Sequence, residues 1–386
     1  MASSSSSNVP SSTASSRLHS LTGLRFVAAL CVVLEHLSIT AEYIPPGRIS
    51  VSFFFVLSGF VLTWSVRPDD SPRSFWRRRF WKIFPNHVVT WTLMMALLAA
   101  AGISLVPGVL QPGATAPAPA VANLFLWHPW VPSFEFLFSV NPVSWSLGSE
   151  LLFYALFPAL LPLVLRIRQR RLGLAAVGLV ALVWLVPLVS LSFSGRDLMP
   201  GLLQSQYWFD YFFPLSRLPE FILGMVLARM VRHGVRPRVG VALPGIVALV
   251  VLTAATRLEV PAPFMFTAVT IVPIALVVLG AASMDVRGIR SLWRTPVMAF
   301  LGDISFALYL VHPVVNATFD HLLGTRLRSA IGEFGEDAVI ITLCLVAAWV
   351  LFRTVERPLM RRFGSVGDAA ARGTAPDAAP ESPARY

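Results

Sequence analysis

The stretch LGLAAVGLVALVWLVPLVSLSF, residues 172–193, contains no charged side chain. A helix of about 20 apolar residues, rising 1.5 Å per residue, spans the ~30 Å hydrocarbon core of a bilayer. Such runs recur along the 386-residue chain, of which 55% is hydrophobic and only 13% charged. Soluble domains carry about twice that share of charged residues. The sequence therefore predicts a protein that crosses a membrane repeatedly.

Ten apolar runs predict an all-α fold, a polytopic membrane bundle of about ten transmembrane helices. The predicted spans are 20–41, 48–67, 84–106, 145–165, 172–193, 212–231, 238–255, 263–284, 298–320 and 336–357. The first run carries charged residues and lacks a small-residue cleavage site, so it is not a signal peptide. Residues 1–19 are Ser-rich and 361–386 are rich in Ala, Pro and Arg; both are predicted to be disordered cytoplasmic tails around a 20–360 transmembrane domain.

The basic residues are placed unevenly between the spans. All but one are arginine, since Lys82 is the only lysine among 31 Lys and Arg residues. Most of those outside the spans cluster in alternate loops, at 67–82, 166–171, 229–238 and 287–294. By the positive-inside rule, these loops and both termini face the cytoplasm. The net charge of +11 then reflects topology rather than nucleic-acid binding. The arginine bias, with abundant Ala, Val, Leu and Pro, indicates a GC-rich bacterium and hence a bacterial cell membrane.

The loop 107–144 is predicted to face outward. It begins with a Pro/Gly/Ala stretch and continues with an aromatic segment that contains Phe125, Trp127, Trp130 and Phe138. Two interpretations are open: an interfacial aromatic belt, or a re-entrant segment that lines the entrance for a substrate.

Charged groups inside a bilayer are costly and are candidates for function. Arg25 and His36 are eleven residues apart, about three helical turns, so both side chains leave one face of the first span. With the N-terminus inside, Arg25 lies near the cytoplasm and His36 about 16 Å farther out. An arginine could hold the phosphates of coenzyme A while the histidine acts as general base at the thioester. The alternative is a snorkelling arginine and a structural histidine.

Glu150 opens the fourth predicted span at about the depth of His36. A carboxylate there could orient the imidazole and stabilise its protonated form. The alternative is an ion pair that only holds two helices together. Two titratable groups at matched depth on different spans favour a catalytic site.

Two further features belong to the second span and to the loop after it. Ser58-Gly59 is a pair of small residues that allows close helix packing. The basic aromatic cluster 75–82 includes Arg78, Arg79 and Lys82. It either sets topology and binds anionic lipid, or it grips the phosphates of a donor.

Several blocks, in order along the chain, resemble those of the acyltransferase-3 family of bacterial membrane acyltransferases. The first, Leu21–Arg25 followed by ten residues and His36, is similar to the family's basic-residue-x10-His signature. The others are 53–60, 79–85, 145–150, 217–220, 302–312 and 356–358. Lys82 departs from the family's Arg-x-x-Arg pattern, so the bidentate geometry of an arginine is lost there.

The resemblance implies transfer of a short acyl group from acyl-CoA, a co-substrate, to a hydroxyl of a sugar-containing acceptor. It implies no bound cofactor and no metal. His36 is the expected general base and Glu150 its partner. The residues expected to bind donor or substrate are Arg25, Arg78, Arg79, Lys82, Trp145, Ser146, Arg217 and His312. No nucleophilic Ser or Cys is placed near His36, which favours direct transfer over an acyl-enzyme.

The compact length, the Arg-rich composition and the opening Ser20–Arg25 resemble members that acylate macrolides and other antibiotics. O-acetylation of a cell-envelope or exported polysaccharide is the alternative acceptor chemistry. A lipid or drug transporter is the alternative of another class, but the sequence lacks the internal repeats that transporters ordinarily show.

Overall fold

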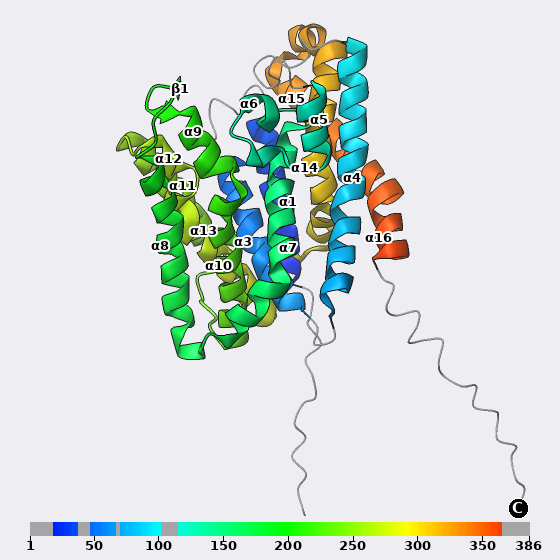
Figure 1. Ribbon diagram of the computed structural model, residues 1–386. Helices are drawn as coiled ribbons and strands as arrows, with labels where there is room; N and C mark the ends of the chain where they lie inside the picture. Colours follow the sequence, from blue (N-terminus) through cyan, green and yellow to red (C-terminus); the bar gives the residue numbers. More distant parts are fainter. Residues whose placement is uncertain (1–17, 38–46, 67–69, 102–114, 365–386) are drawn as a thin grey trace, which may run out of the picture.

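The computed structural model describes residues 18–37, 47–66, 70–101 and 115–364, which form a bundle of helices (Figure 1). The predicted all-α, polytopic membrane fold is confirmed. The long helices are α1 (His19–Glu35), α3 (Gly47–Ser65), α4 (Pro72–Ala101), α7 (Trp145–Arg166), α8 (Leu172–Ser190), α10 (Pro214–Arg232), α11 (Ala242–Arg257), α13 (Ile271–Val286), α14 (Pro296–Leu322) and α15 (Gly324–Leu351).

Short elements join these helices. They are α5 (Pro117–Leu124), η1 (His128–Trp130), α6 (Phe134–Leu137), η2 (Pro142–Ser144), η3 (Gln169–Arg171), α9 (Gln204–Tyr207), η4 (Trp208–Phe212), α12 (Ala262–Met265), η5 (Ala268–Thr270), η6 (Leu292–Arg294), η7 (Phe352–Glu356) and α16 (Arg357–Phe363). In the described ranges the only strands are β1 (Asp197–Met199) and β2 (Leu202–Leu203), which pair antiparallel. Helix α16 runs past residue 360, where the sequence predicted that the membrane domain ends.

The long helices follow the ten predicted spans in order, with different ends. Eight helices of the described chain are long and apolar enough to cross a membrane. The other two are α1, with 17 residues, and α11, with 16. Helix α4 begins at Pro72 instead of residue 84, so the basic aromatic cluster 75–82 is helical. Helix α15 bends at Gly332, whose φ of 72° favours glycine. Predicted span residues 38–41 and 102–106 lie outside the described residues.

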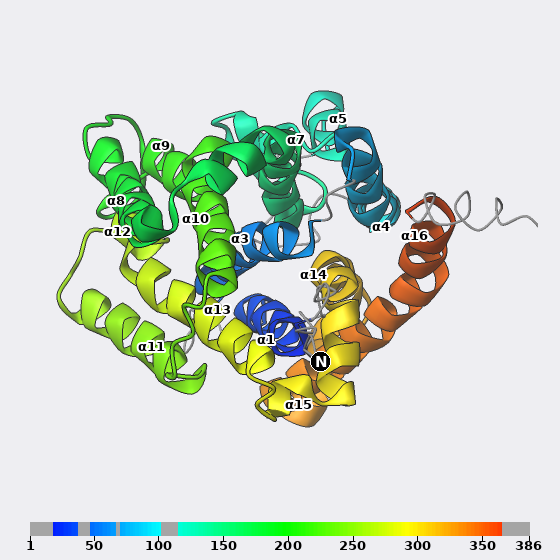
Figure 2. The same ribbon diagram turned by 90° about the horizontal axis from the view of Figure 1, so that it is seen from below.

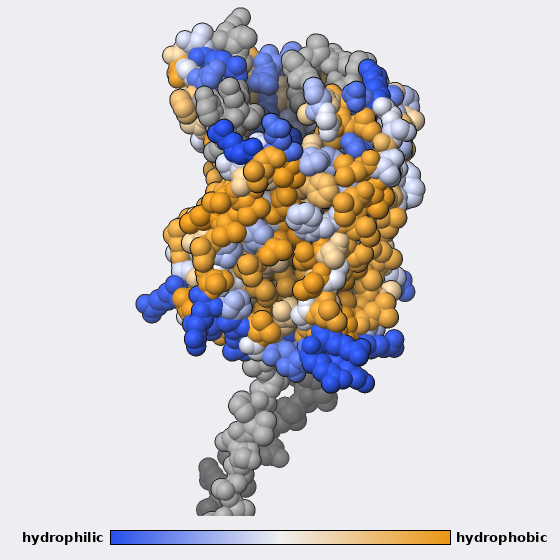
Figure 3. All heavy atoms as spheres, turned by 90° about the vertical axis from the view of Figure 1, so that its left-hand side faces the viewer, coloured by the Kyte–Doolittle hydropathy of each residue, from blue (hydrophilic) through white to orange (hydrophobic). Residues whose placement is uncertain are grey.

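One end of the bundle gathers the arginine-rich connections. Arg229 at the end of α10 donates to Val164 O and Ile167 O at the end of α7, at 2.6 and 2.7 Å. Arg232 donates to Trp64 O at the end of α3, at 2.5 Å. Figure 3 shows a hydrophobic band between two hydrophilic ends, as a membrane-spanning bundle requires. We call the arginine-rich end, where α1 and α4 begin, the inner end.

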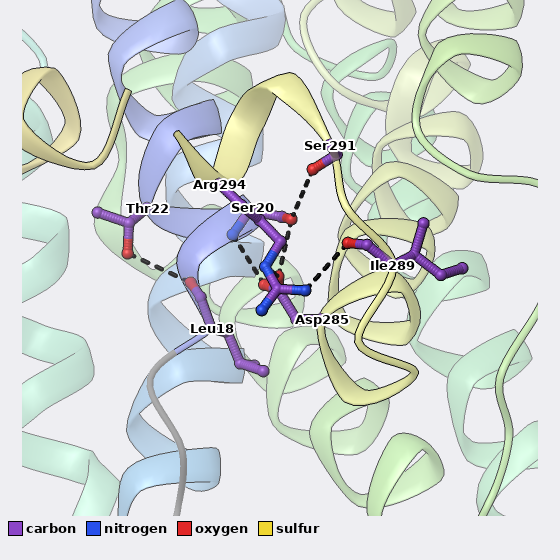
Figure 4. A network of polar contacts seen from close by, with 7 residues as sticks. All are labelled: Leu18, Ser20, Thr22, Asp285, Ile289, Ser291 and Arg294. Atoms are coloured by element: carbon purple, nitrogen blue, oxygen red, sulfur yellow. Dashed lines mark hydrogen bonds and ion pairs between the residues drawn. The ribbon is translucent and has the colours of Figure 1, made fainter. Parts of the chain in front are cut away.

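A polar network fixes the start of α1 at the inner end (Figure 4). The backbone N and Oγ of Ser20 each donate to a carboxylate oxygen of Asp285, both at 2.8 Å. Arg294 Nε lies 3.3 Å from Asp285, and its NH1 donates to Ile289 O at 3.0 Å. The network joins α1 to α13 and η6. It therefore fixes the position of α1, and of its polar side chains, along the axis of the bundle.

Helices α3 and α10 pack closely against each other in the interior. A Cβ added to Gly59 would collide with Phe221 O, and one added to Gly224 would collide with Val56 O. The sequence predicted close packing at Ser58-Gly59, and the Gly59 contact confirms it. Seen along the bundle, α1 lies beside α3, α13 and α14 in the middle of the molecule (Figure 2).

Candidate active site

A cavity of ≈ 310 Å³ lies between α1, α3, α4, α7 and α14. We call it the inner cavity. Its wall combines three cations with two carboxylates and several hydroxyls. The polar lining residues are Arg25, Arg79, Lys82, Glu150, Asp303, Ser146, Ser305, Tyr154 and Tyr309. An apolar interior with a few convergent polar groups is typical of a binding site.

The cations of this region differ in how they are held. Lys82 pairs with the buried Glu356, and Arg78 pairs with Asp70 at 2.8 Å and does not line the cavity. Within the described chain, neither Arg25 nor Arg79 has a salt bridge. Arg79 Nε is buried without a hydrogen-bond partner, and its guanidinium lies 5.8 Å from the Tyr154 ring centre. Guanidinium groups without a bonded carboxylate are suited to a phosphate or carboxylate ligand.

Glu150 lies in the inner cavity, on α7. Tyr154, one turn later, donates a hydrogen bond to it at 3.1 Å. Arg25 and Arg79 are within electrostatic reach of the carboxylate. Tyr154 Oη is 3.3 Å from Ser58 Oγ, so the cluster ties α7 to α3. Glu150 therefore moderates the positive charge of the inner cavity.

A second cavity, of ≈ 220 Å³, lies at the other end of α1. We call it the outer cavity. Its wall combines the side chains of Glu35, His36 and Arg48 with many aromatic rings. The aromatic lining residues are Phe138, Trp145, Tyr207, Tyr211, Phe212 and Tyr309. Rings of this kind provide flat apolar surface for a ligand, and their hydroxyls provide polar contacts at the edge.

His36 follows the last residue of α1 and is exposed. Its Nδ1 lies 2.7 Å from Val32 O, a carbonyl that can only accept. This contact requires the proton on Nδ1, so Nε2 keeps a lone pair in the neutral ring. The ring also lies 5.1 Å from that of the buried His312. His36 is thus held with one nitrogen available as a base.

Glu35, rather than Glu150, shares the outer cavity with His36. In the described chain no hydrogen bond or ion pair joins His36 to Glu150, and Glu150 lines only the inner cavity. Glu35 lies 3.7 Å from Arg48 Nε. Its position directly before His36 was a possible sequence signal, although adjacent helical residues point in different directions.

The segment before α7 borders the outer cavity and also has exposed aromatic rings. Phe138, Pro142 and Val143 line the cavity, as the re-entrant interpretation requires. Phe125 and Trp127 are more than half exposed, as the belt interpretation requires. Both interpretations therefore stay predictions, each compatible with a different part of the segment. Residues 107–114 of this loop lie outside the described residues.

Buried amides hold this segment in place. Asn123 Nδ2 donates to Ser139 O at 2.7 Å, and Asn141 Nδ2 donates to Leu310 O on α14 at 3.1 Å. A lost partner for a buried amide costs about 1–3 kcal/mol. The wall of the outer cavity is therefore firmly attached to the bundle.

The remaining predicted residues lie in different places. Trp145 lines the outer cavity, and Ser146 lines the inner one. His312 lines neither, and contacts the cavity through the ring of His36. Arg217 is fully buried away from both cavities.

Arg217 is paired with Glu220 at 2.9 Å and donates to Ser52 Oγ at 3.0 Å. Its guanidinium lies 5.4 Å from the centre of the Tyr211 ring in the outer cavity wall. This environment leaves no room for the donor-binding role expected from the sequence. It gives Arg217 a supporting position behind the wall.

The two cavities meet at Val51 and Tyr309, which line both. Arg25 opens into one cavity and His36 into the other, about 16 Å apart along α1. In the described chain no group of three or more His, Cys, Asp or Glu side chains could hold a metal ion. The fold and the site define a polytopic membrane protein with a cation-lined inner cavity that leads to a histidine near the outer end.

Comparison with known proteins gives the family. The model of the acyltransferase-3 family, described as an acyltransferase domain, matches residues 18–353. The chain is 38% identical over 384 residues to Acyltransferase MdmB of Streptomyces mycarofaciens, covering 94% of this chain and 96% of the relative. No solved structure matches. The chain belongs to the acyltransferase-3 family and is an acyltransferase.

Other relatives are longer than this chain. It is 24% identical to a putative O-acetyltransferase of Staphylococcus aureus, with 88% of this chain and 57% of the relative covered. It is 23% identical to Peptidoglycan O-acetyltransferase OatA of Listeria monocytogenes, with 89% and 56% covered. The chain thus spans nearly all of MdmB and just over half of these two.

Proposed function

We propose that the protein transfers a short acyl group from acyl-CoA, bound in the inner cavity, to a hydroxyl of an acceptor in the outer cavity. The observation that carries this proposal is the placement of Arg25 and His36 in two cavities that meet at Tyr309. Coenzyme A has its phosphates at one end and its thioester at the other, joined by an extended arm. Arg25 and Arg79, which have no salt bridge within the described ranges, suit the phosphates, and His36 stands where the thioester would arrive.

His36 is the proposed general base. Its Nδ1 is bonded to Val32 O, so Nε2 would accept the proton of the acceptor hydroxyl. The oxygen attacks the thioester carbon, a C–O bond forms, the C–S bond breaks, and the thiolate of coenzyme A leaves and is protonated. Glu35 and Arg48 lie in the same cavity and would contact the acceptor or the imidazolium. Glu150 would act on the donor instead, through Arg25 and Arg79.

A macrolide or another antibiotic is the proposed acceptor. The near full-length similarity to Acyltransferase MdmB supports a compact enzyme of this kind. The aromatic wall of the outer cavity suits an acceptor with extended apolar faces. An envelope or exported polysaccharide is the second candidate, favoured by the similarity to Peptidoglycan O-acetyltransferase OatA.

Purified protein in nanodiscs, incubated with acetyl-CoA and a panel of hydroxyl-bearing macrolides, tests the proposal. Mass spectrometry should detect an acetylated macrolide, and release of free thiol should match it mole for mole. The same reaction with peptidoglycan fragments tests the second candidate. A lipid or drug transporter would move its cargo without releasing thiol, and the absence of thiol release with every acceptor would reject acyl-CoA as the donor.

The proposed orientation places the inner end, and with it both termini, in the cytoplasm of a bacterial cell. The arginine-rich connections at that end support this orientation. The donor, which is made in the cytoplasm, would then enter the inner cavity directly.

A further inference from the structure

Tyr309 of α14 occupies the junction of the two cavities. It is buried and lines both of them. Its ring packs edge-on to Phe54, with centres 6.2 Å apart, and to His312, with centres 6.1 Å apart. His312 in turn contacts the ring of His36. Tyr309 therefore has the proposed base on one side and the proposed donor cavity on the other.

The hydroxyl of Tyr309 is held by one group from each cavity. It donates to Val143 O, in the outer cavity wall, at 3.0 Å. It also lies 2.8 Å from Ser146 Oγ, in the inner cavity wall. Val143 lies in η2, directly before α7, and Ser146 lies in the first turn of α7, so the hydroxyl joins α14 to this segment across the passage.

We propose that Tyr309 closes the passage between the two cavities. Its hydroxyl holds the ring in the closed position through the contacts with Val143 O and Ser146 Oγ, which we call the latch. The closed arrangement keeps water of the outer cavity away from the inner one. The acyl-bearing arm of a donor passes when the phenol leaves Val143 and Ser146. Asn141, just before α7, still holds this segment to α14 through Leu310 O when the hydroxyl is released. Tyr309 is a positioning residue here, because it acts on access to His36.

Thiol accessibility tests the latch without any enzymatic turnover. Ser305 lines the inner cavity, and a Ser305→Cys variant, with both native cysteines replaced by alanine, reports access to it. An impermeant thiol reagent is added outside right-side-out vesicles. Tyr309→Phe and Ser146→Ala should each speed labelling about 2- to 12-fold, the population change for one lost hydrogen bond.

Ser283→Ala is the matched control. Ser283 is a buried serine of α13 that bonds to a backbone carbonyl of its own helix, Leu279 O at 2.6 Å, and lines neither cavity. It should leave the labelling rate unchanged. Equal rates in the parent, Tyr309→Phe and Ser146→Ala would overturn the latch. An equal acceleration by Ser283→Ala would also overturn it, because the effect would then be a general loosening.

A second measurement rests on the proposed function. An open passage admits water to the thioester, so acetyl-CoA and water would give acetate and free coenzyme A thiol. Without acceptor, Tyr309→Phe should release thiol faster than wild type while it binds acetyl-CoA equally well. Wild type that fails to bind acetyl-CoA would reject the proposed donor but not the latch, which the labelling rates decide. Normal binding with unchanged hydrolysis would reject the latch alone.

Discussion

The inner and outer cavities are lined by different kinds of side chain. The inner cavity offers the guanidinium groups of Arg25 and Arg79, neither of which is bonded to a carboxylate among the described residues. The outer cavity offers aromatic rings around His36, and its one arginine, Arg48, is close to Glu35. A ligand that fits both has an anionic end and an end that reacts with a base. This difference in lining side chains is the basis for proposing a donor site in the inner cavity and an acceptor site in the outer one.

Arg217 shows how an arginine without a ligand-binding position is held in this protein. It resembles Arg25 as an arginine in a membrane helix, but it is fully buried and bonded to Glu220 and Ser52. A buried guanidinium must be paired, because an uncompensated buried charge costs several kcal/mol. Arg217 therefore supports the bundle, whereas Arg25 and Arg79, which line a cavity and have no salt bridge within the described chain, are the ligand-binding candidates.

Topology gives the largest expected effect, because it is all or none. Cysteine at Thr115 should react with an impermeant reagent from outside, and cysteine at Gln169 should not, with both native cysteines replaced by alanine. The reason is that Gln169 lies at the arginine-rich end, where it bonds to His233 O at 3.4 Å. Labelling in the reverse pattern would place the inner cavity at the outer face of the membrane and would contradict the proposed donor and acceptor sites.

The second prediction concerns His36→Ala. Loss of a general base typically lowers the rate by about 10²–10⁴-fold. Affinity for coenzyme A should stay at the wild-type value, because His36 is in the other cavity. His321→Ala, an exposed histidine at the end of α14, is the control and should keep full activity. Initial rates and calorimetry on purified protein measure both. Folded His36→Ala with more than about a tenth of the wild-type rate would remove His36 from the mechanism.

The third prediction concerns Arg25→Ala. A lost charge-assisted contact to phosphate is worth about 1.5–3 kcal/mol, or roughly 10- to 150-fold in affinity for coenzyme A. Arg25→Lys should recover only part, because a point charge replaces a planar fork.

Arg78→Ala is the matched control for Arg25→Ala. Arg78 pairs with Asp70 outside both cavities, so its loss should leave coenzyme A binding unchanged. Calorimetry on the solubilised variants gives the affinities. If Arg25→Ala binds coenzyme A as wild type does, Arg25 is structural, and the donor site must be sought at Arg79 and Lys82.

The smallest effect is expected for Glu150→Gln. In the proposed donor site its carboxylate would compete with phosphate for Arg25 and Arg79, so its removal should tighten coenzyme A binding by up to about fivefold. The pH-rate profile should keep its midpoint, because Glu150 does not contact His36. A shifted midpoint with unchanged coenzyme A affinity would instead restore Glu150 as the partner of the base.

Much of the fold was predictable because it depends on local properties. Hydropathy located the long helices in order, and arginine placement marked one end of the bundle. The helix ends were less predictable. The cluster 75–82 was expected in a loop, yet it extends α4 because its aromatic and long basic side chains are compatible with a helix.

The candidate site was only partly predictable. The spacing of Arg25 and His36 predicted their distance and their common helix face, since both lie along one helix. Their assignment to two separate cavities, and that of Glu150 to the inner one, required the structure. Depth can be counted along a helix from its end. The direction in which Glu150 points depends on how α7 is rotated against α1, and hydropathy carries no information on that angle.

The sequence by itself determined the membrane class, the order of the helices and the acyltransferase family, because apolar runs and family motifs are properties of short segments. Only the tertiary structure decided which polar groups share a cavity. The shared cavity of His36 and Tyr211, the bond of Arg217 to Ser52, and the hydroxyl of Tyr309 between Val143 and Ser146 are of this kind. Each depends on the close packing of helices far apart in the chain, where a rotation of one helix by a single residue would replace one set of neighbours with another.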